Sequence, residues 1–192
     1  MISFESLINR NFSVATQAAM LLAARLREPA PAAQEVLTEG MQQLSATVAA
    51  YRRGQPPDDL TIVRIGFDLC LAPIRNQAWR ILDLDPETMT RLLRHLLMRL
   101  DRPLRPPALT LLAFAAWREG QLEQAHTALV TALAIDPFYS TASMLHIAFH
   151  LGLDITDFPG VPQADGSEPG HWPDSRDLDV LRNLLTCYAP FA

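Results

Sequence analysis

The sequence predicts an all-α fold, a compact bundle of about seven to eight helices. Two observations support this prediction. Apolar residues recur at three- and four-residue spacing along most of the chain, and many of the 15 prolines fall between these periodic stretches. Hydrophobic residues make up 49% of the 192 residues, which is enough apolar material for the core of one domain.

Prolines, glycines and capping residues set the expected limits of each helix. Ser13 is the expected N-cap of the first helix, and Asp85 followed by Pro86 and Glu87 is a complete helix start signal. The segment after Asp59 begins with β-branched residues, so a strand is the alternative to a helix there. The predicted helices occupy residues 14–27, 32–53, 59–71, 73–82, 86–100, 108–119, 122–135, 139–151 and 175–187.

The composition changes near residue 153. Residues 1–153 are expected to form the helical domain. Residues 154–174 are rich in proline, glycine and aspartate, which indicates a loop or tail. Residues 175–192 are expected to form a C-terminal helix that packs back on the domain.

The best-specified motif is a helix–turn–helix unit between Leu109 and Pro137. This unit resembles a tetratricopeptide repeat at five matching positions: Ala113, Gly120, Ala125, Ala132 and Pro137. Leu109 and Ala116 stand where the repeat has large aromatic residues, and no second copy occurs at a period near 34 residues. Because a single repeat cannot bury its own faces, we expect one such unit inside a larger helical body rather than a solenoid.

Residues 68–153 resemble the actinobacterial family known as domain of unknown function DUF4192. The resemblance rests on three stretches: residues 71–76 (LAPIRN), 111–120 (LLAFAAWREG) and 132–140 (ALAIDPFYS). Asn76 stands where the family tends to have an acidic residue, and the N-terminal part of the family is expected to be absent. The resemblance implies no activity. All 16 basic residues are arginine, which agrees with a GC-rich bacterial source.

Charge and cysteine usage exclude several classes of protein. The net charge of −5 and a pI near 5.5 argue against nucleic acid or anionic lipid as a partner. Cys70 and Cys187 form no C-x-x-C pair, the first ten residues are no signal peptide, and the longest apolar stretch, 109–117, is too short to span a membrane. These features predict a cytoplasmic protein without a membrane partner.

A metal site is one hypothesis. His146, His150 and Asp154 follow each other at four-residue spacing, which places them on one face of a continuous helix. Two histidines in this arrangement can bind zinc. The glutamate of the H-E-x-x-H metalloprotease pattern is missing and the neighbouring residues are apolar, so an ordinary packed helix is the favoured interpretation.

Four other residues are candidates for partner binding. Arg75 is expected either to bind a partner or to form a buried ion pair with Asp68 or Asp83. Arg102 and Arg105 lie in a proline-rich loop that suits a small anion. Trp117 is either a contact residue or part of the core.

No serine nucleophile elbow, glycine-rich phosphate loop or zinc knuckle occurs, and the sequence predicts no cofactor. The first hypothesis is therefore a non-enzymatic helical interaction module that binds a protein partner or a second copy of itself. The alternative is a metal-dependent or other enzyme centred on His146, His150 and Asp154. A second alternative is a DNA-associated regulator, for which a basic stripe would be needed, formed by Arg91, Arg94, Arg99, Arg102 and Arg105.

Overall fold

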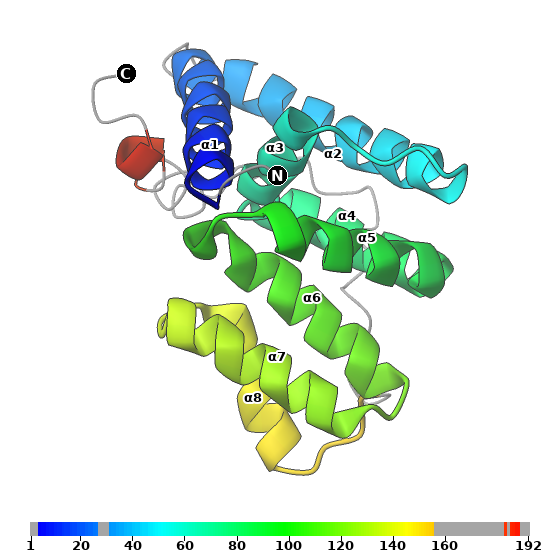
Figure 1. Cartoon of the computed structure of the whole chain (residues 1–192). Coiled ribbons are helices and arrows are strands. Elements are labelled where there is room, and N and C mark those ends of the chain that lie inside the picture. Colours follow the sequence, from blue (N-terminus) through cyan, green and yellow to red (C-terminus); the bar gives the residue numbers. More distant parts are fainter. Residues whose placement is uncertain (1–3, 27–30, 156–182, 184, 189–192) are drawn as a thin grey trace.

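The computed structural model describes residues 4–26, 31–155, 183 and 185–188, and these form an all-α fold (Figure 1). In chain order, the described elements are α1 (Phe4–Leu26), α2 (Pro31–Arg52), α3 (Asp59–Asp68), α4 (Ala72–Leu84), α5 (Pro86–Arg99), the 3-10 turn η1 (Arg102–Leu104), α6 (Arg105–Arg118), α7 (Leu122–Ile135) and α8 (Ser140–His150). The described residues contain no strand, which confirms the predicted fold class. None of the described helices combines the length and the apolar character needed to cross a bilayer.

The helices pack as a bundle that extends from α1 and α2 at one end to α7 and α8 at the other (Figure 1). Helix α1 packs on α3, and α2 packs on α4 and α5. Helix α6 lies across the middle of the molecule, and α7 and α8 follow on its far side, away from α1 and α2 (Figure 1). The molecule therefore has one end made by α1–α3 and another made by α7 and α8.

Amphipathic spacing explains how these helices bury a core. In α5, Leu92, Leu93 and Leu96 are fully buried, whereas Arg91 and Arg94 are exposed. The side chain of Asp85 accepts a hydrogen bond from the Thr88 backbone N–H at 3.2 Å, so the predicted start of this helix is confirmed. Helix α3 is capped in the same way, since the Asp58 side chain accepts a hydrogen bond from the Thr61 backbone N–H.

The structure corrects the predicted starts of two helices, and it decides between helix and strand for a third segment. Helix α1 begins at Phe4, so Ser13 lies inside it and is not its N-cap. Helix α6 begins at Arg105 rather than at residue 108, because Pro106 and Pro107 fit the first turn, where backbone N–H groups have no helical partner. The β-branched segment after Asp59 is a helix and ends at Asp68.

The hairpin of α6 and α7 makes the most extensive contact between any two of the described helices. Gly120 closes α6 with a φ of 72°, a left-handed conformation that glycine adopts without strain. Three small residues of α7, Ala125, Ala128 and Ala132, are buried against α6 and allow the two backbones to approach closely. This close packing fixes α7 in place, and α8 then packs on both α6 and α7.

The C-terminal part of the chain contributes two buried side chains among its described residues. Leu185 and Tyr188 are buried in the core, and the Tyr188 ring packs edge-on against Phe67 with ring centroids 5.4 Å apart. Most of the predicted loop at 154–174 and most of the predicted helix at 175–187 lie outside the described residues.

Candidate metal centre

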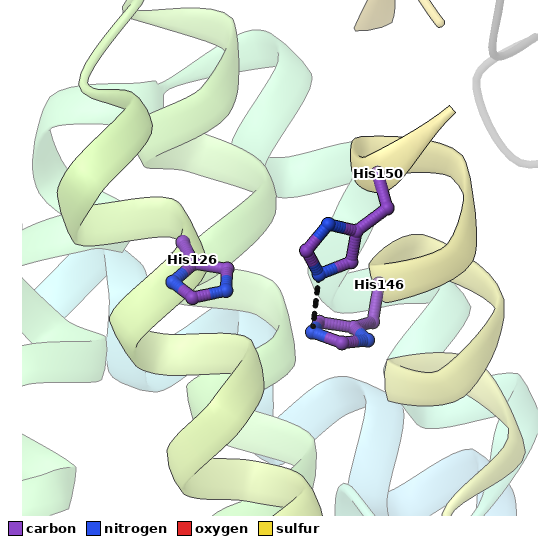
Figure 2. A group of neighbouring side chains, drawn as sticks. All are labelled: His126, His146 and His150. Carbon is purple, nitrogen blue, oxygen red and sulfur yellow. Dashed lines mark hydrogen bonds between the residues drawn. The ribbon is translucent and has the colours of Figure 1, made fainter. Parts of the chain in front are cut away.

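Three histidine side chains meet between α7 and α8. His126 comes from α7, and His146 and His150 come from successive turns of α8. Each offers one ring nitrogen, and these three nitrogens lie within 4.8 Å of one another. It is the one group of three or more potential metal ligands found among the described residues. The rings point into the same space between the two helices (Figure 2).

The spacing of the rings is close to that of a tri-histidine metal site. The Nε2 atoms of His146 and His150 are 3.0 Å apart, and the His126 ring lies 5.8 Å and 5.5 Å from the other two ring centroids. Zinc–nitrogen bonds of about 2.0–2.1 Å in tetrahedral geometry place ligand nitrogens about 3.4 Å apart. The pair His146 and His150 is slightly closer than this spacing, and the full group, within 4.8 Å, is somewhat wider.

Aromatic side chains pack against the histidine cluster. The Phe149 ring stacks beside His126 with centroids 5.7 Å apart, and it packs edge-on against the buried Trp117 at 5.2 Å. His126 and His146 are partly buried, whereas His150 is exposed. The cluster is thus packed on aromatic side chains and reaches solvent at His150.

The surroundings of His146 favour the neutral form of its ring. Burial lowers the pKa of His146 below its ordinary value of 6.5, and the neighbouring His150 and His126 lower it further because adjacent imidazolium charges repel each other. A metal ion binds the neutral ring, so the proton competes less at neutral pH than it does at an isolated histidine.

The structure brings together only two residues of the predicted trio His146, His150 and Asp154. The two histidines are brought together, but α8 ends at His150 and Gly152 adopts a φ of 66°. Asp154 is therefore not one further turn along the same helix, and it is not among the three clustered ligands. The third histidine, His126, was not a candidate in the sequence because it lies on a different helix.

The other candidate residues have structural contacts. Arg75 lies over the ring of Tyr139, with its guanidinium carbon 5.8 Å from the centroid, and the expected ion pair is wrong because Asp68 pairs with Arg64 and Asp83 with Arg118. Arg102 donates to the Ala134 carbonyl at 3.3 Å, and Arg105 donates to the Leu100 carbonyl at 2.7 Å. Trp117 is buried. None of these four residues lies in the histidine cluster.

The predicted basic stripe is also partly engaged in contacts within the chain. Arg99 pairs with Asp59 at 2.6 Å, and Arg91 lies over the Tyr51 ring with its guanidinium carbon 5.7 Å from the centroid.

Comparison with curated proteins finds no significant match, and comparison with solved structures finds none either. The sequence model of one family, described as a domain of unknown function (DUF4192), matches residues 6–154. The match covers more than half of the chain and begins well upstream of residue 68, where the resemblance predicted from the sequence begins. The chain therefore belongs to the DUF4192 family.

Proposed function

We propose that this protein binds a divalent transition-metal ion, with zinc as the reference ion, through His126, His146 and His150. One observation carries the proposal, the convergence of three ring nitrogens within 4.8 Å from two helices. Imidazole is a ligand that suits zinc, copper, iron and nickel, and three neutral histidines leave the full charge of the ion uncompensated.

The geometry also limits what the bound ion would do. Three protein ligands leave a tetrahedral ion with one open position, which water or an external ligand occupies. His150 is exposed, so that position is accessible from solvent. An ion with an open position lowers the pKa of a bound water molecule or polarises a bound carbonyl or phosphoryl oxygen. These are the two effects that we propose to test first.

We expect the purified, untagged chain to bind one zinc ion in isothermal titration calorimetry at pH 7.5. Substitution of any one histidine, H126Q, H146Q or H150Q, should weaken binding at least about 100-fold because each removes one of three ligands. Binding should also weaken as the pH falls, because protons compete with the ion for the ring nitrogens.

The control is H95Q. His95 packs edge-on against Tyr51, with ring centroids 5.7 Å apart, and is not part of the cluster. This variant should bind zinc like the wild type. Equal zinc affinity in the wild type and the triple variant H126Q/H146Q/H150Q would refute the proposal.

A second candidate function, self-association, is favoured by the surface around the cluster. Several large apolar side chains of α7 and α8 are exposed, and Ile147 is 60% exposed. Helix α8 carries no acidic residue and no arginine, so two copies would meet without like-charge repulsion. We propose a second copy of this chain as the occupant of the apolar face of α8, which consists of Met144, Ile147 and Leu151 at three- and four-residue spacing. The resemblance of α6 and α7 to a tetratricopeptide unit, a fold element that stacks on like units, supports the same proposal.

We expect light scattering with size-exclusion chromatography to give a dimer mass at micromolar concentration, and I147D to give a monomer. The matched control is L84D. Leu84 lies on α4 and is 86% exposed, but it is not part of the apolar face, so its replacement should leave the mass unchanged. A wild-type monomer at every concentration would contradict self-association.

A further inference from the structure

A cavity opens at the other end of the molecule, between α1, α2 and α3. It holds about 220 Å³ and is lined by residues of all three helices. Pockets for drug-sized ligands are typically about 300–1,000 Å³, so this cavity suits a smaller molecule. It shares no residue with the histidine cluster, so a proposal for this cavity does not depend on the metal proposal.

Helix α3 supplies hydrogen-bond donors to this cavity. Arg64 lines it, and its Nε donates to the Asp68 carboxylate at 2.8 Å. The Nε bond fixes the guanidinium plane while its two terminal nitrogens stay outside that bond. Thr61, one turn earlier on the same helix, also lines the cavity, but its hydroxyl group and backbone N–H already donate to the Asp58 carboxylate. The terminal donors of the Arg64 guanidinium are a suitable site for a carboxylate.

The Asp68 carboxylate that pairs with Arg64 is almost completely buried. Asp68 is 1% exposed, and its Oδ2 atom has no hydrogen-bond partner. Helix α2 approaches it closely at Gly40, where an added Cβ would lie 3.3 Å from the Asp68 carboxylate. A buried charge held in this way is costly for stability. We attribute the arrangement to positioning, because Asp68 holds Arg64 in one orientation toward the cavity.

Helix α2 supplies acceptors on the opposite wall. Glu39 and Gln43 lie one turn apart and both line the cavity. Arg25 donates to both oxygens of Glu39, yet each oxygen keeps lone pairs that can accept another donor. The Nε2 of Gln43 donates to Thr47 at 3.4 Å, so its carbonyl oxygen is an acceptor for a ligand.

The two charged walls face the cavity without pairing with each other. Within the described residues, Glu39 forms its ion pair with Arg25, and Arg64 forms its ion pair with Asp68. The charge of Arg64 nevertheless contributes to lowering the pKa of Glu39, after the larger effect of the hydrogen bond from Arg25. Glu39 and Arg64 therefore keep separate ion-pair partners, and both line the same small volume.

We propose that this cavity binds a small α-amino acid with an apolar side chain. Its carboxylate would lie on the terminal nitrogens of Arg64, and its ammonium group would lie on Glu39 and Gln43. The remaining lining is apolar, and Ala18, Leu21 and Leu60 would contact the side chain. A free carboxylic acid or a free amine matches only one of the two walls.

The test compares L-leucine with its two halves, 4-methylpentanoate and 3-methylbutylamine, in NMR titrations of the full chain. L-leucine should bind at least tenfold more tightly than either half, with chemical-shift changes at α2 and α3. E39Q should weaken leucine binding at least tenfold while binding of 4-methylpentanoate stays the same or improves. E35Q is the matched control on the same helix, because Glu35 does not line this cavity.

The positioning role of Asp68 has its own readout. D68N should weaken leucine binding at least tenfold without loss of folding, measured by denaturation of the same sample. Two results would overturn the proposal: absence of any shift at millimolar leucine, or equal binding of leucine and 4-methylpentanoate by the wild type. A retained leucine affinity in D68N would overturn the role given to Asp68.

Discussion

The variant F67A is expected to lower the free energy of unfolding by about 4 kcal/mol. Phe67 lies on α3 and is among the largest fully buried side chains of the described core. Its removal costs the transfer free energy of the ring and leaves a cavity that α3 and its neighbours fill only in part. The edge-on pair with Tyr188, whose centroids are 5.4 Å apart at an angle of 84°, is lost as well.

Urea denaturation followed by circular dichroism measures this loss. The matched control is F138A, since Phe138 lies in the turn between α7 and α8 and is 92% exposed. F138A should change the free energy of unfolding by less than about 0.5 kcal/mol. A loss below about 1 kcal/mol in F67A would mean that the core is not packed around this ring.

The second large effect concerns the pH dependence of stability and its removal in D68N. Burial raises the pKa of Asp68 from its usual 3.8 to about 6, against the lowering effect of Arg64. The folded state therefore binds more protons than the unfolded state between about pH 4 and 6. It follows that the contribution of Asp68 to stability is greatest below pH 4 and is lost as the pH rises through 6.

A difference of about two pKa units corresponds to about 3 kcal/mol. D68N resembles the protonated side chain, so it should be more stable than the wild type by up to about 3 kcal/mol at pH 7.5 and nearly equal to it at pH 4. Denaturation curves at both values check this. D83N, which removes a partly exposed carboxylate paired with Arg118, should change stability by less than about 1 kcal/mol at either pH. A D68N variant that is less stable than the wild type at pH 7.5 contradicts the sign.

Much of the fold was predictable because local signals mark the helix ends. Asp85 and Pro86 start α5, and Gly120 ends α6, through capping and backbone conformation that depend on a few neighbouring residues. The start of α1 was not predictable in this way. Ser13 has the chemistry of a cap, but helical backbone continues through it to Phe4, and nothing local distinguishes a capping serine from one inside a helix.

The candidate site was predictable only as far as one helix reaches. The spacing of His146 and His150 indicates a shared face, whereas His126 joins them only because the α6–α7 hairpin and α8 pack together. Asp154 fits the same spacing rule, but Gly152 ends the regular geometry before it. The cavity at Arg64 depends on three helices and leaves no pattern in the sequence.

The place of the three histidines in the chain has a consequence for local opening. His126 and His150 are 24 residues apart, so an ion bound to both closes a short loop, and short loops cost little entropy to close. Such an ion would act on the α7–α8 unit rather than on the whole bundle. In amide hydrogen exchange, it would slow the opening of these two helices while α1 and α2 continue to open at their own rates.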